Sequence, residues 1–196
     1  MAADRSFRLA PILLEAGFVV LGVFLALVAN EWRADVNARK QAAIARTGIV
    51  EEVRANREAV RAMRDYHARL IDTLRTFGPE DAAPSPRLFS RGFANAATTL
   101  STAWDAANAT DAVSHMAFDD VLAFSELYAQ QRRYERVAEE VGSVIFGALF
   151  DRGTSGVTRN HRSLADINGS LLYLEHGLVA AYDSVLARLD GAPATD

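Results

Sequence analysis

The segment from residue 9 to residue 29, LAPILLEAGFVVLGVFLALVA, constrains the fold of this chain more than any other feature. At a rise of about 1.5 Å per residue, its length matches the roughly 30 Å hydrocarbon core of a bilayer. Its aliphatic and aromatic side chains together outweigh the insertion cost of Glu15, about 3 kcal/mol. The sequence therefore predicts an uncleaved transmembrane anchor over 9–29, with Trp32 and Arg33 in the headgroup layer as interfacial anchors.

Two other interpretations of this segment stay open: a helix buried in a protein core, and a cleavable signal peptide with Arg5 and Arg8 as its basic start. Cleavage after Ala29 would place Leu27 at the −3 position, where a small residue is needed, so the anchor is favoured. We expect a single-pass protein of a bacterial inner membrane. The side of the membrane that the rest of the chain faces is left open, because basic residues flank the segment at both ends.

Composition and motifs exclude several classes of function. The net charge of −4 offers no basic stripe for nucleic acid. The chain has no cysteine, so thiol chemistry, disulfides and thiolate metal sites are excluded. Its histidines lack metal-ligand spacing, and it has neither a nucleophile elbow nor a phosphate loop. We expect no cofactor, no metal and no catalytic residue; a membrane-bound hydrolase is a lesser alternative.

A heptad pattern follows the anchor, and it predicts one helix over 30–77 with a single buried seam. The seam positions alternate spacings of four and three: Ile49, Val53, Asn56, Val60, Met63, His67, Leu70, Leu74 and Phe77. Because no proline lies between Ala29 and Phe77, the anchor and this helix can form one rod. We expect the polar seam residues Asn56 and His67 to fix the register of the helix.

The rest of the chain is also predicted to be helical. A tail over 1–8, a loop over 78–87 and a flexible tail over 191–196 bound a bundle that occupies 88–190. Within it we expect a mostly helical stretch over 88–108, a long helix over 117–150 that buries VGSVIFGALF, a loop over 151–160 and a last helix. The last helix carries its own predicted seam: Leu164, Ile167, Leu171, Leu174, Leu178, Ala181, Val185 and Leu189. The expected fold is all-α, an N-terminal transmembrane helix continuing into an antiparallel helical bundle.

One face of the anchor carries a candidate helix–helix interface. On an ideal helix Glu15, Gly22, Ala26 and Asn30 share a face, and the two small residues allow close approach of a second helix. A carboxyl group in a bilayer is costly unless it is protonated, paired or near water. We expect an assembly contact here; a proton relay and a Glu15 side chain that reaches the interface are the alternatives.

The run from Glu15 to about residue 60 resembles a bacterial family of single-pass membrane proteins of unknown function. The resemblance lies in Glu15 before an apolar stretch with Gly22, then Asn30 with Trp32, then a Glu-x-x-x-Asn step at Glu52. It implies a membrane-anchored helical protein and no assigned activity.

The partners expected are therefore the lipid bilayer and either a second copy or another membrane protein. The function expected is an interaction or assembly module. The alternative is a ligand-sensing helical bundle anchored to the inner membrane and working through a partner. In that alternative, the aromatic stripe of the helix over 117–150 would form a pocket wall.

Overall fold

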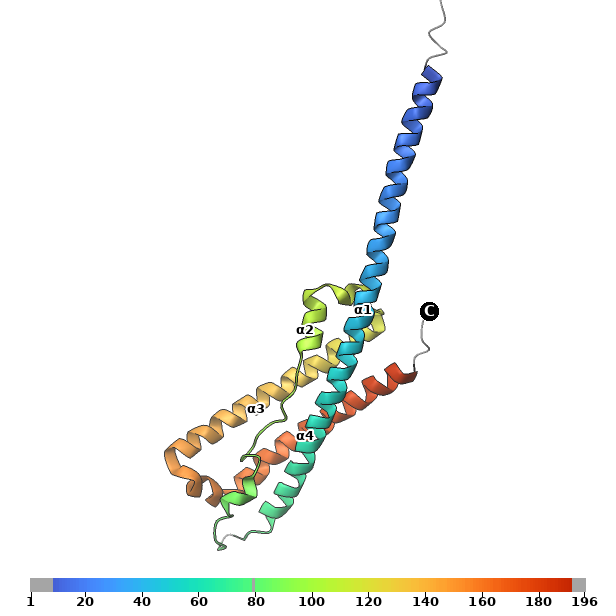
Figure 1. Cartoon of the computed structure of the whole chain (residues 1–196). Helices are drawn as coiled ribbons and strands as arrows, with labels where there is room; N and C mark the ends of the chain where they lie inside the picture. The colour runs from blue at the N-terminus through green and yellow to red at the C-terminus, as the bar shows by residue number, and fades with distance from the viewer. Residues whose placement is uncertain (1–8, 79, 192–196) are drawn as a thin grey trace, which may run out of the picture.

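Helix α1 runs without a break from Leu9 to Arg75, over 67 residues, which makes it about 100 Å long (Figure 1). The expected rod is thus confirmed. Gly48, the weakest helix former between the anchor and the seam, does not interrupt it, and a Cβ there would make only an ordinary contact, 3.8 Å from the Cβ of Ala103. The apolar segment and the seam consequently belong to one rigid element.

The computed structural model describes residues 9–78 and 80–191. Within these ranges the chain is helical with no strand, which confirms the all-α class. The other elements are the short 3-10 helices η2 (Pro86–Phe89) and η3 (Ala112–His115), and the α-helices α2 (Thr102–Ala109), α3 (Phe118–Arg159) and α4 (His161–Gly191). The predicted tail over 1–8 and residues 192–196 of the predicted tail over 191–196 lie outside the described residues, while Gly191 is the last residue of α4.

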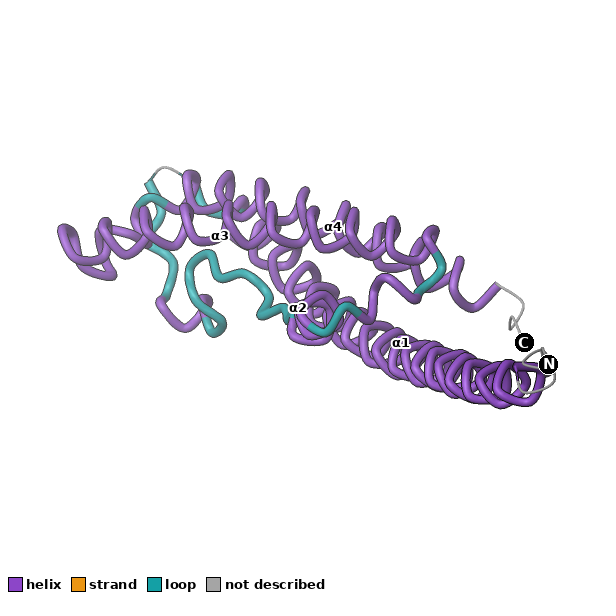
Figure 2. Tube along the Cα trace, turned by 90° about the horizontal axis from the view of Figure 1, so that it is seen from above, coloured by secondary structure: helices purple, strands orange, loops and turns teal. Residues whose placement is uncertain are grey.

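Helix α4 packs antiparallel to α1, as paired contacts show. The numbers rise along α1 while they fall along α4, in the pairs Arg54 with Asp190, Arg61 with Asp183, His67 with Glu175, and Phe77 with His161. Helix α3 also runs antiparallel to α4, and the two lie side by side in Figure 2. The predicted antiparallel bundle is therefore present, with α2 packed near the end where α1 enters it (Figure 1).

The seam of α1 is filled by the chain's own bundle. Ile49, Val53, Val60 and His67 are fully buried, and the apolar members pack against residues of α2, α3 and α4. Burying this apolar stripe stabilises the fold by about 25 cal/mol for each Å² removed from water. A second chain does not have access to this side of α1.

The stretch over 88–108 differs from the prediction. Only η2 and α2 are helical there, and residues 90–101, which we call the connecting segment, lie outside any helix. Its hydroxyl-bearing residues are weak helix formers, and its backbone groups bond instead to side chains of the surrounding helices. The space of a fourth long helix is partly filled by this extended chain.

The end of α3 also differs from the prediction. Residues 151–159 are helical rather than a loop, with one break at Gly153, whose φ of 64° and ψ of 177° suit glycine. The expected helix over VGSVIFGALF is present, with Ile145 buried and Val141, Ala148 and Leu149 partly buried against the core, but the expected burial is wrong for its other side. Phe146 and Phe150 are 74% and 93% exposed, because at this end α3 packs chiefly on α4.

The apolar part of α1 stands outside the bundle. From Leu13 to Asn30 every side chain is exposed, so the reading of this segment as a buried core helix is wrong. It is the one helix in the described part of the chain that is long and apolar enough to cross a membrane. Between Asn30 and Ala42, the first buried residue of α1, about 18 Å of mostly exposed helix forms a stalk.

Candidate functional site

A buried polar layer crosses the bundle, and Asn56 lies at its centre. The Asn56 Nδ2 donates to the backbone oxygen of Leu100 (2.7 Å), and the Leu100 nitrogen donates to Asn56 Oδ1 (2.9 Å). The amide side chain of Asn56 thus pairs with the backbone of Leu100 through one N–H and one C=O on each side, as two residues of paired β-strands do. Asn56 Nδ2 also donates to Gln131 Oε1 (3.1 Å), so one α1 side chain joins the connecting segment to α3.

Glu52, one turn before Asn56, supports the start of α2. The nitrogen of Ala103 donates to Glu52 Oε2 (2.9 Å), and the hydroxyl of Tyr128 donates to Glu52 Oε1 (2.6 Å). Ser101 occupies the N-cap position of α2 without a side-chain capping bond. A carboxylate from α1 therefore satisfies an otherwise free N–H at the helix start, where negative charge is favourable.

Gln131 links α3 to two further elements. Its Nε2 donates to the oxygens of Leu100 (3.1 Å) and Glu135 (3.0 Å), while its Oε1 accepts from the Tyr182 hydroxyl of α4 (2.7 Å). The Thr99 hydroxyl donates to the same Glu135 oxygen. Both ends of the Gln131 amide are thus satisfied in a fixed orientation.

The second half of the layer surrounds Glu175 of α4. The nitrogen of Ala97 donates to the Tyr134 hydroxyl (2.7 Å), which donates to Glu175 Oε1 (3.0 Å). The other carboxyl oxygen lies 3.0 Å from Nδ1 of His67. Both His67 and Glu175 are fully buried, and the Nε2 of His67 has no partner among the described residues. Breaking either contact would leave a polar group without water.

Both polar residues singled out in the α1 seam, Asn56 and His67, are therefore buried and hydrogen-bonded; their role in setting register remains a prediction. The polar contacts of the other members, Glu52, Gln131, Tyr134 and Glu175, were not predicted from the sequence. A signal existed for Glu175, which lies four residues after Leu171 and three before Leu178, at helical spacing with fully buried residues.

Burial raises the pKa of three tyrosines in this layer well above its usual range: Tyr128, Tyr134 and Tyr182. Neighbouring carboxylates raise it further, Glu52 beside Tyr128 and Glu175 beside Tyr134. In the folded chain these phenols stay neutral at pH values where an unfolded chain loses their protons.

This difference predicts a loss of stability in alkali. The pKa of these tyrosines is higher in the folded chain than the value of about 10 in the unfolded chain. Their contribution to the free energy of unfolding is therefore complete below pH 10 and is lost as the pH rises above it. The free energy of unfolding should fall by about 1.4 kcal/mol per tyrosine for each pH unit above 10. Thermal unfolding of Tyr182→Phe should depend less steeply on pH than that of the exposed-site control Tyr173→Phe. A native chain whose five tyrosines all ionise together near pH 10, followed by absorbance at 295 nm, would contradict the prediction.

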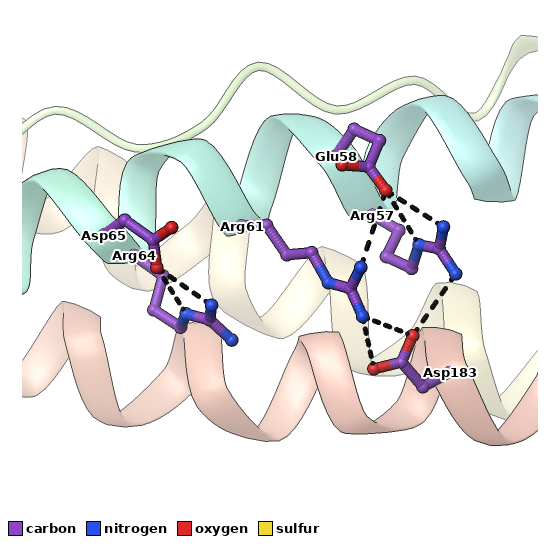
Figure 3. Close-up of polar contacts among 6 residues, drawn as sticks. All are labelled: Arg57, Glu58, Arg61, Arg64, Asp65 and Asp183. Carbon is purple, nitrogen blue, oxygen red and sulfur yellow. Dashed lines mark hydrogen bonds and ion pairs between the residues drawn. The ribbon is translucent and has the colours of Figure 1, made fainter.

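A strip of ion pairs lies on the solvent side of the contact between α1 and α4 (Figure 3). Asp183 of α4 accepts from Arg61 through both oxygens (2.9 Å each) and from Arg57 (3.4 Å). Glu58 holds the same two arginines from the α1 side. These side chains are partly exposed, so each pair contributes at most about 1 kcal/mol. The strip aligns the helices, and its charges are already paired.

The predicted interface on the anchor lies away from this layer. Glu15, Gly22, Ala26 and Asn30 are all exposed on α1, outside the bundle, and a Cβ added at Gly22 would meet nothing within 4 Å. The bundle makes no contact with this face. The two predicted interfacial anchors, Trp32 and Arg33, follow it on the exposed stalk.

The aromatic stripe forms part of the core. The rings of Trp104 and Tyr128 stack with centroids 5.5 Å apart, and Phe124 packs beside Trp104; all three are buried, whereas Phe118 is exposed. Among the described residues no cluster of His, Asp and Glu could hold a metal ion.

In comparisons with known proteins, no family model, no curated protein and no solved structure matches this chain.

Proposed function

We propose that the chain is a single-pass, membrane-anchored assembly module of a bacterial inner membrane, which associates through the face formed by Glu15, Gly22, Ala26 and Asn30. We call this set the span face. The observation that carries the proposal is the separation of this face from the bundle: the residues are exposed on the apolar part of α1, and no other part of the described chain approaches them.

Glu15 supports the proposal because the transfer of its carboxyl group into a bilayer costs free energy. A carboxyl group placed in hydrocarbon is unfavourable by several kcal/mol unless it is hydrogen-bonded or reaches water. The bundle supplies no partner, because it begins near Ala42, beyond the stalk. A second span with the same residue offers a hydrogen-bonding partner at the same depth.

Gly22 supports the proposal because it lies within the exposed helix, at a position where the fold itself does not need a glycine. A glycine inside a helix is less favourable than alanine by about 1 kcal/mol. Nothing in the fold requires it, because a Cβ at this site meets no atom within 4 Å. A close approach of another helix gives the missing side chain a physical reason, and Ala26 continues the small surface one turn later.

The fold leaves the span face as the place for association along α1. The seam that could form a coiled coil is occupied by α2, α3 and α4 of the same chain. Because α1 is continuous, a contact made in the membrane would hold two stalks parallel and two bundles at a fixed height.

Crosslinking at the stalk tests this function. Lys40 is the single lysine, so an amine crosslinker applied to the full chain in membranes reports contact between stalks, and Lys40→Arg identifies that product. Combining Glu15→Leu with Gly22→Ile should lower the crosslinked fraction about tenfold, a loss of roughly 1.4 kcal/mol.

The matched control is Gly17→Ile, which adds the same side chain on a different face of the span, where nothing lies within 4 Å either. This variant should crosslink like the unaltered chain. Equal crosslinked fractions in all variants would contradict the proposal.

A second candidate function, a ligand-sensing bundle that works through a partner, is favoured by a different observation. A cavity lies between α3 and α4 at the end of the bundle far from α2.

A further inference from the structure

The hairpin end of α3 and α4 borders a partly open cavity of about 480 Å³, which we call the tip cavity. Its floor is apolar, formed by Ile145, Val157 and Leu164, all of which are buried. The turn between the two helices bounds one end of it. Small-molecule sites in proteins are mostly apolar hollows of about 300 to 1,000 Å³, so the size is that of a ligand site.

Two glycines are required to shape this cavity. Gly153 has a φ of 64° with a ψ of 177°, a combination that other residues avoid, and it turns the last part of α3 back on itself. At Gly156 a Cβ would lie 2.4 Å from the Cβ of Arg152, so a larger residue cannot stand there without displacing the backbone. The break in α3 thus separates the helices at the tip, where a tight connection would have closed the space.

Gly156 also determines where Arg152 lies. The first three side-chain carbons of Arg152 run past the bare face of Gly156, within 4 Å of the position of its absent Cβ. Arg152 lines the cavity, and the described part of the chain provides no ion-pair partner for it. The guanidinium group of Arg152 therefore lies beside the apolar floor of the tip cavity without an ion-pair partner among the described residues.

From this geometry we propose that the tip cavity binds a single-chain amphiphile with one carboxylate head, of the fatty-acid class. The alkyl tail lies on the floor of Ile145, Val157 and Leu164, and the carboxylate pairs with the guanidinium of Arg152 in the two-pronged geometry that arginine favours. Asp151 lines the same cavity, and its negative charge limits the anionic charge that the site accepts, which favours one carboxylate over a phosphate.

The size of the space selects this occupant over a peptide helix. A helix with its side chains is about 10 Å across and needs a groove open at both ends. The tip cavity is bounded by the turn of the hairpin at one end. An alkyl chain needs no hydrogen bonds within the hollow, so it can lie on the apolar floor without leaving backbone groups unsatisfied.

Photolabelling of the full chain in lipid nanodiscs tests the proposal, with a fatty acid that carries a diazirine on its tail as the probe. Labelled positions are mapped by mass spectrometry. We expect labelling of residues 144–167 that unlabelled fatty acid competes away. Ala148→Leu, which fills the cavity, should lower this labelling about tenfold, whereas Ala180→Leu, the same change on the exposed side of α4, should not alter it.

The head group is tested with a second pair of variants. Arg152→Gln should lower labelling by the carboxylate probe about threefold to fivefold and leave labelling by its methyl ester unchanged, because a partly exposed ion pair contributes up to about 1 kcal/mol. Arg132→Gln, exposed on α3, is the control. If Ala148→Leu fails to fold, Ser163→Leu fills the cavity from α4.

Labelling confined to the apolar span, where the probe dissolves in the bilayer, would overturn the proposal. Labelling of the tip that persists in the cavity-filling variant would overturn it as well. Equal labelling of Arg152→Gln and the unaltered chain by the carboxylate probe would overturn the assignment of the head group.

Discussion

Replacing Glu175 with leucine is expected to lower the free energy of unfolding by about 3 to 5 kcal/mol. The variant removes the partner of two buried groups, the His67 ring (3.0 Å from Nδ1) and the Tyr134 hydroxyl (3.0 Å). Both groups stay buried, because α1 and α3 pack around them. Chemical unfolding of the full chain in detergent micelles, followed by near-ultraviolet circular dichroism, measures the change in the bundle separately from the span.

A double-mutant cycle separates the pair from its surroundings. The variant that carries both His67→Leu and Glu175→Leu replaces the pair with apolar side chains, so it should be less destabilised than Glu175→Leu alone. The Tyr134 hydroxyl still accepts from the Ala97 nitrogen in the double variant. Strict additivity of the two single effects would show that the two side chains do not interact, contrary to the structure.

Replacing Asn56 with leucine is expected to cost about 2 to 3 kcal/mol and to release the connecting segment. The Leu100 nitrogen would lose its acceptor, and Gln131 Oε1 would lose one of its two donors. Side-chain size is nearly preserved, so the loss comes from hydrogen bonding and not from a cavity. Hydrogen exchange of the Leu100 amide is the direct readout, because its protection should fall more than that of amides within α3.

Asn37→Leu is the matched control for this change. Asn37 lies on the same helix, exposed on the stalk, and its replacement should change the stability by less than about 0.5 kcal/mol. If Asn56→Leu behaves like Asn37→Leu in both stability and exchange, the polar layer does not hold the connecting segment.

The sequence predicts the parts of this fold that are held by repeats of apolar residues better than the parts that are held by buried polar residues. The seam of α1 is read correctly, because Ile49, Val53 and Val60 recur at helical spacing and are all fully buried. In α4 the predicted stripe packs on the core, but the buried side of the helix is wider than the stripe. Leu164, Leu171, Leu178 and Leu189 are buried as expected. The other buried residues of α4 lie outside the predicted stripe: His161, Ala165, Asn168, Glu175, Val179, Tyr182 and Leu186.

The buried side of α4 is wider than its apolar stripe because partners far away in sequence decide the burial of polar residues. Glu175 is buried because His67 and Tyr134 bind it, and they lie 108 and 41 positions away. The connecting segment is extended for the same reason: Asn56, Gln131 and Tyr134 offer hydrogen bonds to its backbone, which local propensity does not reveal. The polar layer could therefore be predicted only at Asn56 and His67, where polar residues interrupt an apolar repeat.

At the tip of the hairpin, the hydrophobic pattern of the sequence does not predict which residues are buried. Residues 141–150 are mostly apolar, and burial was the natural inference, yet Phe146 and Phe150 face outward. Periodicity shows that a helix has an apolar side but not whether a neighbour reaches it. In α3 the neighbour α4 covers only the side that contains Ile145.

The most direct test of the central claim, that the chain assembles through the span face, is a single-cysteine crosslinking scan of residues 13–30 in native membranes. The chain has no cysteine of its own, so each variant reports one position without background. The account predicts disulfide formation that peaks at Gly22 and Ala26 and is lowest at Leu13, Val20 and Phe24, which lie on the opposite side of the helix. A uniform profile, or a maximum on the side of Phe24, would contradict it.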